Sequence, residues 1–117
     1  MASKLDAFRA VYVDVDLTLI NWPDDRPVLP TDTVEAMRAA GATVNQPLVD
    51  ELSSWRVSSP DRELVVWSAN GAAHARAAAK LAGIEDFTEA CLTKPQVFVD
   101  DNPQWVAKRT WLSPSLF

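Results

Sequence analysis

The sequence predicts an α/β fold in which a short parallel sheet of about four strands carries helices on both faces. Two observations support this prediction. Short apolar runs of strand length alternate along the chain with segments of helical character. Strands that are separated by helices pair in parallel, because each helix returns the chain to the same end of the sheet. With 117 residues, 48% of them apolar, the chain is expected to form one domain, residues 1–117.

The first half of the chain starts with a strand and continues with two helices. Residues 10–14 form an apolar strand, and residues 22–30 form a proline-rich loop without helical periodicity. A helix is expected to begin near Thr31 and to end at Gly41. A second helix covers residues 46–55, where apolar side chains recur at helical spacing.

The second half repeats the alternation of strands and helices. We expect strands at residues 64–67, 87–92 and 97–99, and helices at residues 72–82 and 104–112. The segment 72–82 is dense in alanine, which favours a helix, and a glycine follows it directly.

Acidic side chains directly follow two of these strands. Asp14 and Asp16 stand at the end of the first strand, and their spacing puts them on one face of an extended chain. Asp100 and Asp101 follow the strand expected at 97–99. Carboxylates at the end of an apolar strand need a partner or a function, and ligands bind at this edge of parallel sheets. The two strands are therefore predicted to be neighbours that share a site for Mg²⁺.

A hydroxyl group and an ammonium group lie between the two acidic pairs. Ser68 ends the strand at 64–67 and is followed by a turn, and Lys94 precedes a proline shortly before the second acidic pair. Carboxylates, a hydroxyl and an ammonium in this order are suited to a phosphoryl group with Mg²⁺.

These motifs together resemble the haloacid dehalogenase-like phosphohydrolases over residues 11–111. The first motif of that family, Asp-x-Asp-x-Thr, stands here at residues 14–18, and Ser68, Lys94 and the acidic pair at 100–101 follow in the family's order. The resemblance implies a three-layer Rossmann-like sandwich. The intervals between the motifs leave no room for a folded cap, so we expect a small capless member with an open site that takes a large substrate or borrows a neighbouring subunit as its lid.

The resemblance also implies catalytic roles. Asp14 is the nucleophile that forms an aspartyl-phosphate, and Asp16 is the general acid and base, with its main-chain carbonyl on Mg²⁺. Asp100 and Asp101 complete the metal shell; we favour Asp101 for the direct contact and Asp100 for a contact through water, and the choice stays open. Lys94 neutralises the transferring group.

Further residues are expected to hold the substrate. Ser68 and the backbone N–H groups of Ala69 and Asn70 would bind phosphoryl oxygens together with Lys94. Thr18 is expected to brace the loop after the first strand by hydrogen bonding and is counted with the substrate-binding residues.

Three residues near these motifs have two interpretations each. Trp22 either stacks on a substrate ring or staples its loop to the core. His74, the single histidine, either faces the site or, as we favour, is a surface or core residue. Arg26 either clamps a second phosphate or pairs with Asp24.

Composition limits the possible partners. The net charge of −5 argues against broad, charge-driven binding of nucleic acid, although a polynucleotide end can still enter a small site. The longest apolar runs are of strand length, and the N-terminus has no apolar signal core, so we expect no membrane span and a cytoplasmic location. An oligomer is possible.

The sequence therefore predicts a Mg²⁺-dependent phosphatase of this family. Polynucleotide ends, phosphoproteins and small phosphorylated metabolites all remain candidate substrates. The alternatives are a catalytically inactive binding or assembly protein on the same fold, and a phosphotransferase that passes the phosphoryl group to an acceptor other than water.

Overall fold

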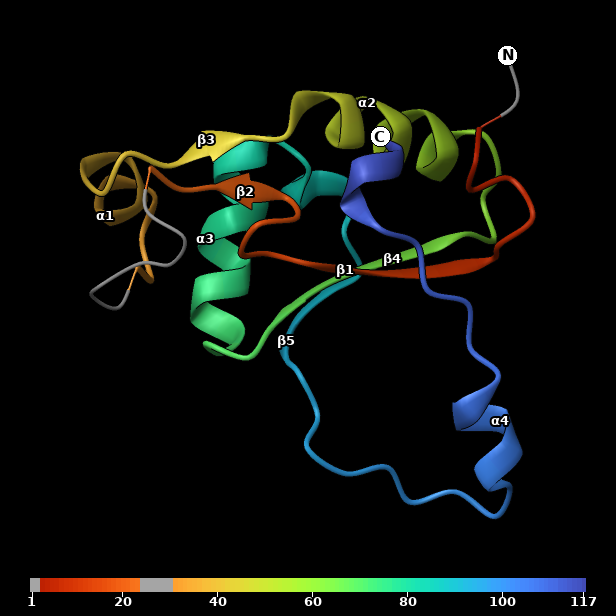
Figure 1. The fold of residues 1–117 in the computed structure, drawn as a ribbon. Helices are drawn as coiled ribbons and strands as arrows, with labels where there is room; N and C mark the ends of the chain where they lie inside the picture. Colours follow the sequence, from red (N-terminus) through yellow and green to blue (C-terminus); the bar gives the residue numbers. More distant parts are fainter. Residues whose placement is uncertain (1–2, 24–30) are drawn as a thin grey trace.

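Three parallel strands make the main sheet of the computed structural model, which describes residues 3–23 and 31–117 (Figure 1). The strands β1 (Ala10–Asp14), β4 (Glu63–Ser68) and β5 (Ala90–Thr93) lie in the order β1-β4-β5. Their register places Asp14 beside Trp67, and Ser68 beside Thr93. The α/β class and the first two strands are therefore as predicted, and the short strand expected at 87–92 is β5.

The part of the chain that the structure describes has four helices, the fourth of which lies on a loop that projects away from the sheet (Figure 1). They are α1 (Val34–Ala39), α2 (Gln46–Val57), α3 (Ala72–Ala82) and α4 (Pro103–Ala107), and two short 3₁₀ turns cover Glu85–Phe87 and Pro114–Leu116. Helices α1 and α4 are shorter than expected. Thr33, rather than Thr31, caps α1 by accepting a hydrogen bond from the Ala36 N–H. Gly83 ends α3 in the left-handed conformation, as its position suggested.

A small second sheet forms where the sequence indicated only a loop and helices. Strand β2 (Ile20–Asn21) pairs antiparallel with β3 (Thr43–Val44). Asn45 links this sheet to the loop after β1, since its side-chain amide donates to the Thr18 carbonyl at 2.9 Å, while its oxygen caps α2. Strands of two residues are too short to show an alternation of apolar and polar residues, so the sequence could not predict this sheet.

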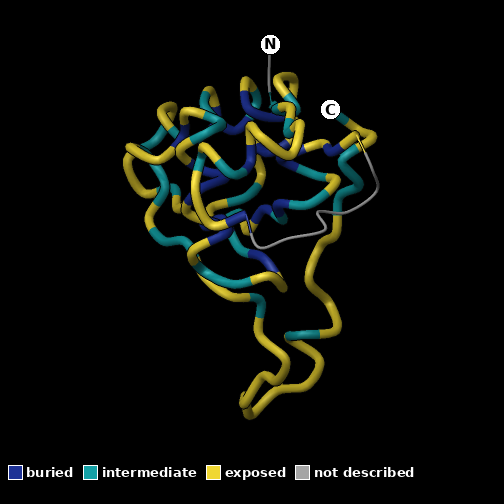
Figure 2. Tube along the Cα trace, turned by 90° about the vertical axis from the view of Figure 1, so that its left-hand side faces the viewer, coloured by how far each residue is buried: buried dark blue, intermediate teal, exposed yellow. Residues whose placement is uncertain are grey.

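The core lies between the sheet and its neighbouring helices. Helix α3 packs against β4 and β5, and α2 contacts β4. Figure 2 shows buried segments concentrated in the body of the molecule, away from the long exposed loop that carries α4. The largest fully buried apolar side chains include Trp55, Leu52, Leu64, Met37 and Ile84.

The strand expected at residues 97–99 is not formed. Val97, Phe98 and Val99 expose 74%, 55% and 98% of their surface, and the segment loops away from the sheet (Figures 1 and 2). The prediction used strand propensity, which reflects packing on a neighbouring strand more than an intrinsic backbone preference. Because this segment has no such neighbour, the described sheet has three strands instead of about four.

No helix in the described ranges combines the length and the apolar character needed to span a membrane. Asp24 and Arg26 lie outside the described residues, as does most of the loop expected at 22–30, so the two interpretations of Arg26 stay open.

Candidate active site

The carboxyl ends of the three parallel strands bring several of the predicted site residues together. Asp14 ends β1, Ser68 ends β4, and Lys94 follows the last residue of β5. The Lys94 ammonium lies 3.0 Å from Oδ1 of Asp14, and the Lys94 backbone N–H donates to the Ser68 carbonyl at 2.9 Å. Residues from three distant parts of the sequence thus meet at one edge of the sheet.

A tight loop after β1 brings the Thr18 hydroxyl within hydrogen-bond distance of the Asp14 carboxylate. The backbone N–H groups of Thr18 and Ile20 both donate to the Val15 carbonyl, and Leu17 has a positive φ of 61°. In this loop the Thr18 hydroxyl donates to Oδ2 of Asp14 at 3.3 Å. The two oxygens of the Asp14 carboxylate therefore face a hydroxyl and an ammonium, and its side chain stays one-third exposed.

Asp16 lies in a different environment, because three donors hold its carboxylate. The Trp22 indole Nε1–H and His74 Nε2 lie 3.0 Å and 2.9 Å from Oδ1, and the Asn70 amide donates to Oδ2 at 2.7 Å. Burial opposes the charged form of Asp16, but the hydrogen bond and charge of His74 and the bonds from Asn70 and Trp22 outweigh it. The pKa of Asp16 is therefore lowered.

His74 is buried in the first turn of α3 and is only 1% exposed. Its Nδ1 lies 2.8 Å from the Thr31 hydroxyl oxygen and 3.0 Å from the Thr31 carbonyl oxygen. Burial would lower the pKa of His74, but the hydrogen bond and negative charge of Asp16, together with the Thr31 carbonyl and the charge of Asp32, raise it. Asp16 and His74 therefore each stabilise the charged form of the other.

The structure decides between the interpretations of Trp22 and His74. Trp22 is 9% exposed, belongs to the core and bonds to Asp16, so it staples its loop to the body of the protein. Its ring stacks beside the His74 imidazole, with ring centres 6.2 Å apart. His74 is a core residue, as favoured from the sequence, but it also contacts a candidate site residue. The feature of the sequence that pointed to this contact is the position of His74 in the first turn of the helix that follows Ser68.

The turn between β4 and α3 organises Ser68, Ala69 and Asn70. Ser68 is buried, and its Oγ accepts the Asn70 backbone N–H at 3.0 Å. The turn continues through Gly71, whose φ of 108° belongs to the region that favours glycine. Ala69 and Asn70 are exposed at the same edge of the sheet as Asp14. The backbone N–H groups of Asn70 and Gly71 are both bonded within the turn, to Oγ and to the carbonyl oxygen of Ser68 respectively.

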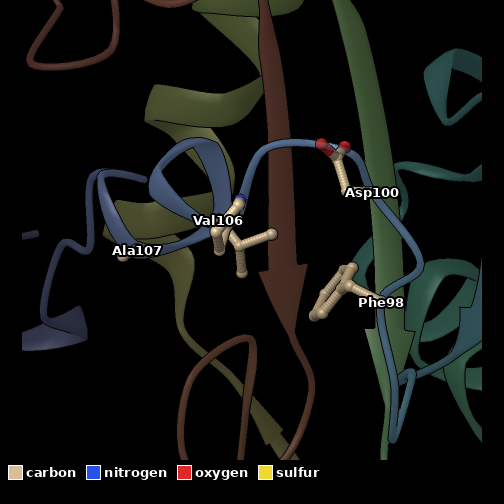
Figure 3. A pocket seen from close by; sticks show the side chains of 5 residues that line it. Phe98, Asp100, Val106 and Ala107 are labelled. Carbon is tan, nitrogen blue, oxygen red and sulfur yellow. The ribbon is translucent and has the colours of Figure 1, made fainter.

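Asp100 and Asp101 are not joined to this cluster. Both are exposed, and Asp100 accepts the Asn102 N–H at 2.8 Å in a turn that begins α4. Asp100 also lines an open pocket of about 420 Å³ with Phe98, Pro103, Val106 and Ala107 (Figure 3). Figure 3 shows the Phe98 and Val106 side chains directed toward each other across this pocket.

The expected metal set of Asp14, the Asp16 carbonyl, Asp100 and Asp101 is therefore not assembled. Across residues 3–23 and 31–117, no group of three or more His, Cys, Asp or Glu side chains is arranged to hold a metal ion. The physical reason is the missing strand at 97–99, which was expected to carry Asp100 and Asp101 to the edge of the sheet. Asp14 and the Asp16 carbonyl still supply oxygen atoms of the kind that Mg²⁺ prefers.

Comparison of the chain with protein-family models, with curated proteins and with solved structures gave no match.

Proposed function

We propose that this protein is a phosphatase that hydrolyses phosphoric monoesters through an aspartyl-phosphate at Asp14, on a three-layer Rossmann-like framework of the haloacid dehalogenase type. The observation that supports this most is the setting of Asp14. Its carboxylate ends β1 between the Lys94 ammonium and the Thr18 hydroxyl, with Asp16 two residues further along. An accessible carboxylate beside a fixed cation is suited to attack on an anionic phosphoryl group.

In the first step, an oxygen of Asp14 attacks the phosphorus atom and the phosphorus–oxygen bond to the leaving group breaks. The leaving oxygen takes the electron pair of that bond and a proton from the Asp16 carboxyl group. Lys94 offsets the negative charge of the transferring group. The Ser68 hydroxyl and the backbone N–H groups of Ala69 and Asn70 would bind its oxygens, with the Asn70 N–H exchanging its bond to Ser68 Oγ for a phosphoryl oxygen.

In the second step, water attacks the phosphorus atom of the aspartyl-phosphate and gives one proton to the Asp16 carboxylate. The bond between phosphorus and the Asp14 oxygen breaks, which releases inorganic phosphate and restores the Asp14 carboxylate. Asp16 is then protonated for the next turnover, so the two steps balance in protons.

The proposed reaction uses Mg²⁺ to neutralise negative charge. The Asp14 carboxylate and the Asp16 carbonyl would hold it, together with Asp101 and Asp100 if their exposed segment closes against the sheet. Bound there, Mg²⁺ would neutralise charge on the phosphoryl oxygens. The commitment of the Asp16 side chain to three hydrogen-bond donors is consistent with a metal contact through its carbonyl only.

The substrate class follows from the openness of this edge. Asn70 and Ala69 are exposed and Asp14 is partly exposed, so a bulky phosphorylated end can reach the nucleophile. We therefore favour large substrates, such as a polynucleotide end or a phosphoprotein.

Turnover of p-nitrophenyl phosphate tests the proposal, measured with and without Mg²⁺ for the wild type, for Asp14→Asn and for Asp50→Asn. Asp50 is an exposed aspartate of α2, remote in sequence from the motifs, and serves as the control. We expect Mg²⁺-dependent turnover that Asp14→Asn abolishes and Asp50→Asn retains. Equal activity of all three proteins would contradict the proposal.

A non-catalytic binding protein is the second candidate. It is favoured by the exposed apolar side chains of Val97, Phe98 and Val99, together with those of Trp105 and Trp111. If no phosphate ester is turned over and beryllofluoride does not bind at Asp14, this candidate replaces the phosphatase.

A further inference from the structure

We infer that His74 and Trp22 are positioning residues for proton transfer by Asp16, and that Oδ2 of Asp16 is the atom that exchanges the proton. This inference rests on the proposed phosphatase function. It concerns how the acid and base of that reaction is held, which the motifs of the sequence do not specify.

The two oxygens of Asp16 are held differently. Oδ1 lies within hydrogen-bond distance of His74 Nε2 and Trp22 Nε1, both from residues that are almost fully buried. Within residues 3–23 and 31–117, Oδ2 is held by the amide of Asn70 alone, and Asn70 is exposed. A substrate or water molecule can therefore replace the partner of Oδ2 far more easily than the partners of Oδ1.

His74, which contacts Oδ1 of Asp16, is itself held in place by its neighbours. The Nδ1 atom of His74 lies against the hydroxyl and the carbonyl of Thr31, which is 3% exposed, and the Trp22 ring stacks on the imidazole. His74 also belongs to α3, which packs on β4 and β5. The support for Asp16 thus reaches the core of the protein, so its carboxylate has one defined orientation relative to Asp14.

A defined orientation matters because Asp16 acts twice. It gives a proton to the leaving oxygen in the first step and takes one from water in the second. A displacement of about 1 Å can reduce the rate of such a step about 100-fold. The effect depends on the leaving group, since a poor leaving group needs the proton and a good one departs largely without it.

The test compares kcat/KM for p-nitrophenyl phosphate, which has a good leaving group, with kcat/KM for a simple alkyl phosphate, which has a poor one. For an enzyme of this mechanism, kcat/KM reports the steps through formation of the aspartyl-phosphate. The variants are His74→Ala, His74→Gln and Trp22→Phe. At position 74, Gln retains an N–H donor. At position 22, Phe keeps an aromatic ring but lacks the indole N–H that donates to Oδ1 of Asp16. Ala78→Gly, in the buried face of the same helix, is the structural control.

We expect His74→Ala and Trp22→Phe to reduce kcat/KM for the alkyl phosphate about 10- to 100-fold and that for p-nitrophenyl phosphate less than about threefold. His74→Gln should recover part of the loss, and Ala78→Gly should change both esters by the same factor. If His74→Ala does not fold, Trp22→Phe and His74→Gln decide the question.

Equal losses on both esters in the His74 and Trp22 variants would overturn the inference and leave the phosphatase proposal intact. If the wild type turns over neither ester and does not bind beryllofluoride at Asp14, both the inference and the phosphatase proposal are overturned. The activity of the wild type therefore separates failure of the inference from failure of the proposed function.

Discussion

The Nε2 atom of His74 lies 2.9 Å from Oδ1 of Asp16, although 58 residues separate them in the sequence. This contact joins the loop after β1 to the first turn of α3 across the edge of the sheet. The buried imidazole favours the charged carboxylate, and the carboxylate favours the imidazolium, so each raises the stability of the other's ionised form. The candidate active site is thereby tied to the hydrophobic core.

Replacing Lys94 by Met should reduce kcat/KM for p-nitrophenyl phosphate about 100- to 1,000-fold, because it removes the cation that lies 3.0 Å from Asp14. Stability should change little, since this ion pair is more than one-third exposed at Lys94. Steady-state kinetics and urea unfolding check the two expectations. The control is Lys80→Met, which removes an exposed cation 3.9 Å from Glu85. Similar kinetic losses in both variants would rule out a specific role for Lys94.

Glu89 should make the stability of the protein depend on pH at the acidic end. Its carboxylate accepts hydrogen bonds from the Arg56 side chain and from the Leu64 backbone N–H. Burial alone would raise the pKa of Glu89, but these bonds and the Arg56 charge outweigh it and lower the pKa below the ordinary value of 4.5. The stabilisation is therefore fully present above the unfolded-state pKa and is lost as the pH falls through the lower folded-state pKa.

Urea unfolding of Glu89→Gln as a function of pH checks this expectation. The variant should be less stable than the wild type at pH values above 4.5, and the difference should shrink as the pH falls below it. Glu85→Gln, at an exposed position in the turn before β5, is the control. A difference between Glu89→Gln and the wild type that does not change with pH would contradict the assignment.

Leu52→Ala should lower the free energy of unfolding by about 2–5 kcal/mol, because Leu52 is fully buried in α2 and its truncation leaves a cavity in the core. Val57→Ala, at the exposed end of the same helix, should change it by less than about 0.5 kcal/mol. Chemical denaturation of both variants measures the difference. Equal effects would mean that α2 does not present its Leu52 face to the core.

Val99→Ser tests the position of the segment that was expected to be a strand. Because Val99 is 98% exposed, the substitution should change the free energy of unfolding by less than about 0.5 kcal/mol. A core strand would respond with a loss of well over 1 kcal/mol. Repeating the measurement with Mg²⁺ shows whether the metal brings the segment against the sheet, in which case the loss would appear only with Mg²⁺ present.

Much of the local structure followed from local chemistry. The apolar strand before Asp14, the strand before Ser68 and the alanine-dense helix that ends at Gly83 are each specified by residues within a few positions of one another. The same reasoning was wrong at residues 97–99, where the apolar run has the composition of a strand but no strand beside it. Propensity describes what a segment favours once a partner is present, and it does not supply the partner.

The sequence by itself determined the α/β class, the parallel strands that precede Asp16, Asn70 and Lys94, and the chemical types of the side chains at the ends of these strands. Only the tertiary structure decided that Lys94 pairs with Asp14, that Trp22 and His74 hold Asp16, and that Asp100 and Asp101 stand apart from them. The reason is physical. Strand and helix periods depend on neighbours in the sequence, whereas a contact between residues 16 and 74 depends on how the sheet and α3 pack, and that packing is a property of the whole folded chain.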